Sequence, residues 1–155
     1  MPQAWSVIDY RGAFTFASPP ERVWAAIERV DTFEQSWGWL SEFHLEGDGL
    51  APGSVLIGVV SPPLPYRMRL RVVVEGSDPG RRIDAAVHGD LEGRASLVLD
   101  PAGEGTRATV AWTIEMVQRP MRIAARVGYP LLRWGHDRVV EATVSGFRRR
   151  LESQA

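Results

Sequence analysis

The chain has 155 residues, which is about the size of one domain. Hydrophobic residues make up 45% of it and charged residues 24%, close to average globular usage, so a disordered or collagen-like chain is excluded. The formal net charge is −1, whereas a phosphate-binding surface usually leaves a basic excess, so we expect no nucleic-acid partner. Cysteine is absent, which excludes disulfides and thiolate chemistry.

The beginning of the chain carries no targeting pattern. Residues 1–5 show neither the basic nor the apolar part of a secretory signal. No apolar run approaches the roughly 18 residues that a membrane-spanning helix needs. We therefore expect a cytoplasmic protein.

The first third of the chain predicts a strand followed by two short helices. Residues 13–16 alternate as a strand does, and this strand reaches back toward Trp5. Residues 18–21 resemble a capping box with Ser18 as the N-cap, which predicts the start of a helix. A second capping signal at 31–34 predicts another short helix.

The middle of the chain predicts an antiparallel meander. Apolar and polar residues alternate in short runs, and turns rich in Gly and Pro separate these runs. The six predicted strands are 41–46, 55–60, 66–75, 81–88, 91–100 and 106–117.

The last part of the chain predicts a long amphipathic helix over 133–152, with apolar residues at spacings of three and four. A single helix over 120–152 would be about 48 Å long, whereas a domain of this size is about 40 Å across. Gly128-Tyr129-Pro130 is a natural break. We therefore predict a separate or kinked piece at 120–129. The whole pattern indicates an α+β domain in which the helix covers the apolar face of the sheet.

This order of elements resembles the START/birch-allergen-like superfamily (SRPBCC), whose bacterial members are often described as polyketide cyclase/dehydrase. The matching stretches are Phe16–Trp24, the meander, residues 134–138 and the helix end at 146–151. The resemblance covers essentially the whole chain and implies a single helix-grip domain. In that fold a curved seven-stranded antiparallel sheet wraps around a long C-terminal helix, with two short helices between strands 1 and 2. The resemblance also implies a cavity that holds lipids, polyketides or other hydrophobic molecules.

Alternation assigns the two faces of the sheet. Apolar residues share the face toward the helix, whereas Arg67, Arg69 and Arg71 share the solvent face. Turns of a meander alternate between the two ends of the sheet, which places aromatic residues, His88 and Arg119 at the same end as the Pro-rich loop 61–65. These aromatic residues either form the mouth of a cavity or fill the core. The residues that we expect to bind the ligand are Trp37, Trp39, Tyr66, Met68, Leu70, Leu97, Trp112, Ile114, Tyr129, His136, Val140 and Phe147.

His136 is the candidate for acid/base chemistry. It precedes Val140 by four residues, so it lies on the apolar face of the long helix, and Tyr66 or Tyr129 is a candidate proton donor at the cavity mouth. The alternative is a structural role, in which a backbone carbonyl or a carboxylate of the protein makes the hydrogen bond of the His136 ring. His44 is expected to be exposed and His88 to lie at the rim. The three histidines lack the spacing of a zinc motif, so we expect no metal and no cofactor.

Three functions remain open at this point. The first is a binding protein for a hydrophobic small molecule, supported by the apolar inner face. The second is a polyketide cyclase/dehydratase that uses His136. The third is a protein-interaction module with a closed cavity. The basic, amphipathic segment 120–129 is either a packed helix or a lid that contacts an anionic membrane or an acidic ligand group. The sequence leaves the ligand and the oligomeric state open.

Overall fold

The computed structural model describes residues 7–64, 66–117 and 119–153, and for residues 119–127 it describes the backbone only. The elements in chain order are β1 (Val7–Phe16), α1 (Pro20–Glu28), a 3₁₀ turn (Val30–Thr32), α2 (Phe33–Ser36), β2 (Leu40–Glu46), β3 (Val55–Val60), β4 (Met68–Asp78), β5 (Arg82–Gly89), β6 (Leu91–Ala102), β7 (Gly105–Met116) and α3 (Arg119–Ser153).

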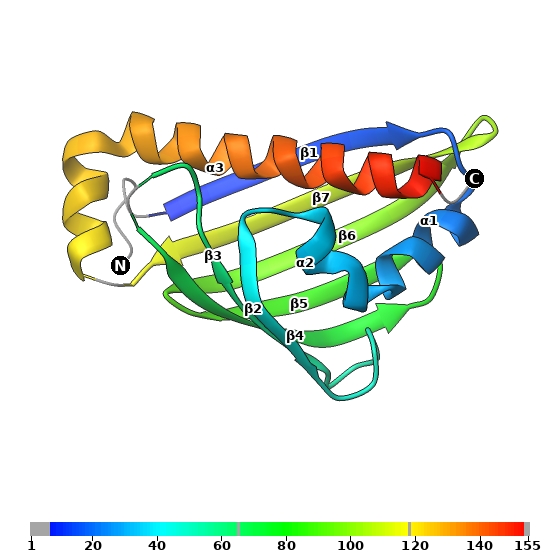
Figure 1. Ribbon diagram of the computed structural model, residues 1–155, viewed down its shortest axis with the longest axis horizontal. Helices are drawn as coiled ribbons and strands as arrows, with labels where there is room; N and C mark the ends of the chain where they lie inside the picture. Colours follow the sequence, from blue (N-terminus) through cyan, green and yellow to red (C-terminus); the bar gives the residue numbers. More distant parts are fainter. Residues whose placement is uncertain (1–6, 65, 118, 154–155) are drawn as a thin grey trace.

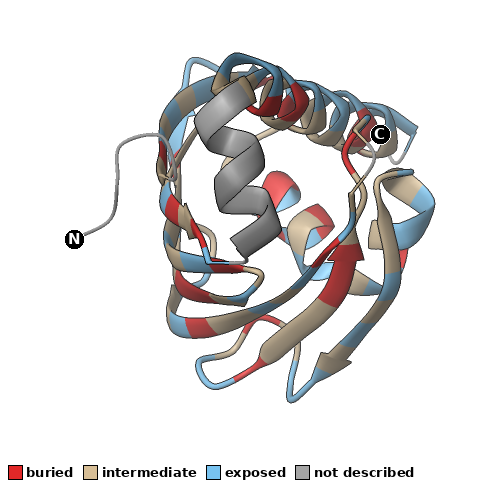
Figure 2. Cartoon of the chain, turned by 90° about the vertical axis from the view of Figure 1, so that its left-hand side faces the viewer, coloured by how far each residue is buried: buried red, intermediate tan, exposed pale blue. Residues whose placement is uncertain are grey.

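The strands form one seven-stranded antiparallel sheet in the order β1-β7-β6-β5-β4-β3-β2. The sheet curls, and α3 lies along its concave side, while α1 and α2 cover the end of the interior near the C-terminus (Figure 1). Seen from the end, the curled sheet and α3 enclose an interior (Figure 2). The predicted α+β helix-grip fold is confirmed.

The faces of the sheet follow the alternation of the sequence. On β4, Met68 is buried, whereas Arg69 and Arg71 are exposed on the opposite face. Just before this strand, exposed Arg67 donates a hydrogen bond of 3.1 Å to Glu42. The outer face is therefore a solvated surface, as the sequence indicates, and Arg67 beside it is paired with a carboxylate.

Two apolar clusters hold α3 on the sheet. One contains Met68, Met116 and Leu132, and it lies around the start of the long part of α3. The other contains Trp24 and Leu151, and it packs α1 against the end of α3. Burial of such side chains contributes about 1.5–3 kcal/mol each, so these clusters are the main reason that the helix stays in place.

The beginning of α1 corrects the predicted capping box. The N-cap is Pro19 rather than Ser18, and no side chain caps the helix. Instead, the backbone N–H groups of Arg22 and Val23 donate to the carbonyl of Pro19. The carbonyl of Ser18 accepts a 2.7 Å hydrogen bond from the buried hydroxyl of Thr106, which fixes this residue against β7.

The predicted break in the last helix is confirmed. Within α3, Gly128 has φ −131° and ψ 40°, which is not helical, and Pro130 follows it. Proline lacks the N–H group that would continue the helix and clashes with the preceding turn, so the chain bends here (Figure 1). The amphipathic pattern predicted for 120–127 concerns side chains outside the described residues. In the part of the chain that is described, no helix is long and apolar enough to cross a membrane.

Candidate functional site

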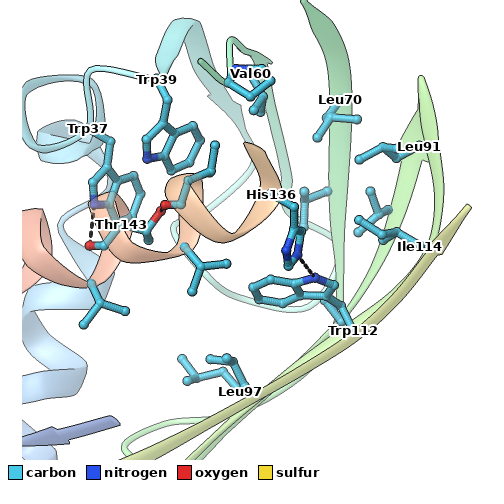
Figure 3. Close-up of a pocket in the computed structure, with 18 of the residues that line it drawn as sticks. Trp37, Trp39, Val60, Leu70, Leu91, Leu97, Trp112, Ile114, His136 and Thr143 are labelled. Atoms are coloured by element: carbon cyan, nitrogen blue, oxygen red, sulfur yellow. Dashed lines mark hydrogen bonds between the residues drawn. The ribbon is translucent and has the colours of Figure 1, made fainter. Parts of the chain in front are cut away.

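A cavity of about 450 Å³ lies between the sheet and α3. Its wall, meaning the residues that line it, takes apolar side chains from the inner face of the sheet, among them Leu70, Leu97 and Ile114 (Figure 3). The residues that α3 contributes are Leu132, His136, Val139, Val140, Thr143, Val144 and Phe147. Because their spacing is that of one helix face, the long straight part of α3 forms one side of the cavity.

All of the predicted ligand-binding residues except Tyr129 lie in this wall. Tyr129 directly follows the kink at Gly128 and packs against the apolar cluster that contains Met68 and Leu132, without lining the cavity itself. Sequence reasoning missed Val139 and Thr143, although their spacing from His136 places them on the same helix face. It also missed Phe33 and Val60, which have no periodic signal that separates a cavity wall from a core.

The wall is almost entirely apolar. No Asp, Glu or Arg side chain lines the cavity among the residues whose side chains are described. The wall residues with polar side-chain atoms are Trp37, Trp39, Tyr66, Trp112, His136 and Thr143. Because transferring an unpaired charge into such surroundings is strongly unfavourable, the cavity suits an uncharged molecule.

One hydrogen bond fixes the state of His136. The indole Nε1 of Trp112 donates to Nε2 of His136 over 2.9 Å (Figure 3). An indole N–H can only donate, so Nε2 carries no proton, and the neutral ring has its proton on Nδ1. That nitrogen lies 2.9 Å from Oδ1 of Asp137, to which it therefore donates. Both nitrogens of the candidate acid/base residue are thus engaged.

The surroundings of His136 keep it neutral. Burial lowers the pKa of the imidazole below its ordinary value of 6.5, and nearby Arg133 acts in the same direction. The hydrogen bond to Asp137 acts against this shift. Asp137 itself is half-exposed and lies 3.4 Å from Nε of Arg133, so its carboxylate is shared between two partners.

Aromatic stacking extends this contact to the edge of the sheet. Tyr10 on β1 is the cross-strand partner of Trp112, and their rings stack with centroids 4.8 Å apart. The ring of His136 meets Tyr10 edge-on, with the two ring centroids 5.2 Å apart. The guanidinium of Arg133 lies 5.9 Å from the centroid of the Tyr10 ring. Burial, followed by the charge of Asp137, raises the pKa of the Tyr10 hydroxyl. These contacts join β1 and β7 to α3 beside the cavity.

On the opposite side, two segments approach α3 closely at glycines of the helix. Shortly after the kink, a Cβ on Gly135 would lie 2.6 Å from Cδ1 of Leu64, which belongs to the Pro-rich loop. Further along, a Cβ on Gly146 would meet the carbonyl oxygen of Ser36 in α2. The absence of side chains at both glycines lets the loop and α2 approach the helix closely.

Two tryptophans lie in the wall between these glycine contacts. The indole Nε1 of Trp37 donates a 2.9 Å hydrogen bond to the carbonyl of Thr143 (Figure 3). The rings of Trp37 and Trp39 stack with centroids 5.3 Å apart. Trp37 therefore ties α2 to the middle of α3 and holds Trp39 against the cavity.

The other predicted residues of this end are only partly brought together. Tyr66 lies in the wall, but β4 begins at Met68, so Tyr66 belongs to the connection before the strand. His88 is not in the wall, because it shares the outer face with Glu92 and bonds to its carboxylate at 2.8 Å. The side chain of Arg119 lies outside the described residues. His44 is exposed, as predicted, 3.7 Å from Glu46.

Nothing in the described residues provides a metal site. No group of three or more His, Asp or Glu side chains in that part of the chain is arranged to hold an ion. The site is therefore built from apolar surface and a few uncharged polar groups.

Comparison with known families decides the identity at the family level. Residues 8–152 match the family described as polyketide cyclase/dehydrase and lipid transport. The chain belongs to this family. The match spans nearly the whole sequence and confirms the resemblance to the SRPBCC superfamily. No curated protein matches the sequence of this family member.

Solved structures share the fold of this polyketide cyclase/dehydrase and lipid transport family member. The protein TTHA0849 from Thermus thermophilus is 19% identical, with a TM-score of 0.77 over 96% of this chain and 99% of that one. Zhui aromatase/cyclase from Streptomyces sp. R1128 is 13% identical, with a TM-score of 0.73 over 94% of each chain. Ara h 8.0201 is 17% identical, with a TM-score of 0.65 over 95% and 99%. At these identities the likeness establishes the fold alone.

Proposed function

We propose that the protein binds an uncharged hydrophobic small molecule, lipid-like or polyketide-like, in the cavity between the sheet and α3. The observation that carries this proposal is an apolar cavity with no charged side chain among the described wall residues. Its volume of about 450 Å³ lies within the range typical of small-molecule sites. The family description supports the proposal, because polyketide cyclisation and lipid transport both involve hydrophobic molecules.

The alternative of a polyketide cyclase/dehydratase receives less support from the geometry. One protein with a similar fold is an aromatase/cyclase, and this similarity is the reason to consider the reaction here. A general base at His136, however, needs a free nitrogen, whereas Nε2 accepts from Trp112 and Nδ1 donates to Asp137. Proton transfer at His136 would require the Trp112 bond to break, so the observed arrangement favours binding over acid/base catalysis.

The alternative of an interaction module with a closed core also receives less support. Such a module would have side chains that fill its interior, whereas this interior holds a cavity bounded by Leu97, Trp112 and Val140. Cavities of this size in a domain are uncommon unless they are used, because interiors are otherwise close-packed.

A peripheral membrane contact near the kink of α3 is part of the proposal. Two large apolar side chains, Leu131 and Trp134, are 58% and 46% exposed directly after the kink. The guanidinium of Arg138 lies 6.0 Å from the Trp134 ring centroid. An exposed Leu and Trp beside Arg is typical of helices that lie at a membrane surface, and the sequence of 120–129 adds basic residues next to them.

Binding of the neutral dye Nile red tests the proposal. Replacing Ala95, which lies in the wall, with Phe fills part of the cavity and is expected to weaken binding about tenfold or more. The matched control is Ala111→Phe, because Ala111 neighbours Trp112 on β7 and therefore lies on the opposite face of the sheet. Circular dichroism checks that both variants are folded. Equal loss of binding in the two variants, or none in either, would contradict a site in this cavity.

A further inference from the structure

The polar atoms of the cavity wall differ in whether the protein already satisfies them. The indole of Trp112 and both nitrogens of His136 are used within the protein. The indole of Trp37 donates to the carbonyl of Thr143, whose own hydroxyl donates to the carbonyl of Val139 over 2.6 Å. None of these groups has a hydrogen left to donate to a ligand.

The hydroxyl of Tyr66 is different. Tyr66 is half-buried and lies in the wall, and its hydroxyl has no hydrogen-bond partner among the residues that the structure describes. Its backbone N–H donates to the carbonyl of Leu64 over 2.8 Å, which fixes the residue close to the start of β4. A tyrosine hydroxyl, with an ordinary pKa of 10.0, is protonated and a donor at neutral pH, and burial raises its pKa further. A donor in apolar surroundings gains free energy when a bound molecule supplies an acceptor.

A second unsatisfied donor lies on the same side of the cavity. The indole Nε1 of Trp39 is buried and has no hydrogen-bond partner within the described part of the chain. The carbonyl of Trp39 accepts from the backbone N–H of Ser61 over 2.8 Å, so Trp39 is joined to the loop that leads to Tyr66. The unsatisfied donors of the described wall therefore belong to the side formed by the α2–β2 and β3–β4 connections, whereas Trp112 and His136 on the other side are satisfied.

We propose that the hydroxyl of Tyr66 donates a hydrogen bond to a carbonyl or hydroxyl oxygen of the ligand and so determines its class and orientation. This rests on the proposed function. The ligand is a neutral apolar molecule with an oxygen at the end that lies beside the β3–β4 connection. A carboxylate is disfavoured, because no cationic side chain lines the cavity among the residues with described side chains to balance its charge.

Three small molecules of similar size separate these properties: 2-ethylnaphthalene, 2-acetylnaphthalene and 2-naphthoate. Their dissociation constants are measured by equilibrium dialysis with the wild-type protein and with Tyr66→Phe. The variant is expected to weaken binding of the ketone about three- to tenfold, the factor that one neutral hydrogen bond gives. Binding of the ethyl compound should stay within about twofold of wild type, because it makes no hydrogen bond. The carboxylate should bind more weakly than the ketone.

The control is Tyr129→Phe, since Tyr129 lies outside the wall and should change none of the three constants. Equal effects of Tyr66→Phe on the ketone and on the ethyl compound would overturn the role of the hydroxyl. Tighter binding of the carboxylate than of the ketone would overturn the ligand class. If neither neutral compound binds the wild-type protein, the proposed function itself fails, which is a different result from binding that does not depend on Tyr66.

Discussion

Trp112 and His136 form the one side-chain hydrogen bond that joins the inner face of β7 to α3 in the described structure, with 2.9 Å between Nε1 and Nε2. This bond requires a neutral imidazole with its proton on Nδ1. The Nδ1–H group donates a hydrogen bond to the carboxylate of Asp137. In this arrangement His136 links the cavity wall on β7 to α3, and its acid/base role stays a prediction. The same placement explains why an ionisable residue is tolerated in an apolar interior.

Replacing His136 with Ala should lower the free energy of unfolding by about 1–3 kcal/mol, because the indole N–H of Trp112 is then left without an acceptor. His136→Gln, which offers an amide oxygen, should lose less. The exposed residue His44 supplies the control, and His44→Ala should stay within about 0.5 kcal/mol of wild type. Urea denaturation measures all three, and equal stability of His136→Ala and wild type would show that the bond contributes nothing.

Stability should fall in mild acid because of His136. Burial lowers the pKa of the folded-state imidazole below the ordinary 6.5. Below about pH 6.5 the unfolded chain therefore binds more protons than the folded one. The free energy of unfolding then falls as the pH is lowered, until the pH reaches the folded-state pKa of His136. Urea denaturation at about pH 7.5 and about pH 5.5, on either side of the unfolded-state pKa, should show a larger drop for wild type than for His136→Gln. An equal drop in the two proteins would mean that His136 is not the group responsible.

The two glycines of α3 should respond in opposite ways to substitution with Ala. At Gly146 the new Cβ meets the backbone carbonyl of Ser36, which cannot move without shifting α2, so a loss of about 1–3 kcal/mol is expected. At Gly135 the obstacle is the flexible end of Leu64, so the better helix propensity of Ala should prevail and stabilise by up to about 1 kcal/mol. Thermal denaturation of both variants checks this, and two changes of the same sign would refute the distinction.

Membrane association should depend on the exposed apolar residues after the kink. Replacing Leu131 and Trp134 together with Ser should reduce co-sedimentation with vesicles of anionic lipid, because both side chains are exposed and apolar. Arg122→Glu with Arg126→Glu should reduce it as well, since basic residues are attracted to an anionic surface. Exposed Ala142, further along α3, supplies the control Ala142→Ser. Unchanged co-sedimentation of both double variants would rule out this membrane contact.

Local sequence patterns predict much of the fold. Most strands alternate between apolar and polar residues, and turns that their residues favour separate them, as at Gly89, which has φ +115° and lies against the backbone carbonyl of Arg69. The kink at Gly128 also follows from local chemistry and from the length of the helix. The inner face was predictable for the same reason, because a period of two assigns residues such as Leu97 and Ile114 to one side.

Other features depend on contacts between distant segments and have no local signal. Ser18 has the composition of an N-cap, but its carbonyl is bound by Thr106 and the helix begins one residue later. By alternation, Gly93 belongs to the inner face of β6, where a small residue suggests room for a ligand. The structure gives another reason for a glycine, because a Cβ there would collide with the backbone of Thr113 on β7. The partner of His136 was equally hidden, because only the position of α3 over the sheet brings Trp112 to it.

The most direct test of a hydrophobic ligand in this cavity is methyl NMR during titration with 2-ethylnaphthalene. Aromatic ring currents shift nearby methyl groups, so we expect large, saturable shifts for Leu97, Ile114 and Val140 in the wall. The methyls of Val73 and Val98, which neighbour wall residues on β4 and β6 and lie on the opposite face of the sheet, should stay in place. Unshifted wall methyls, or shifts confined to Val73 and Val98, would contradict the proposed site.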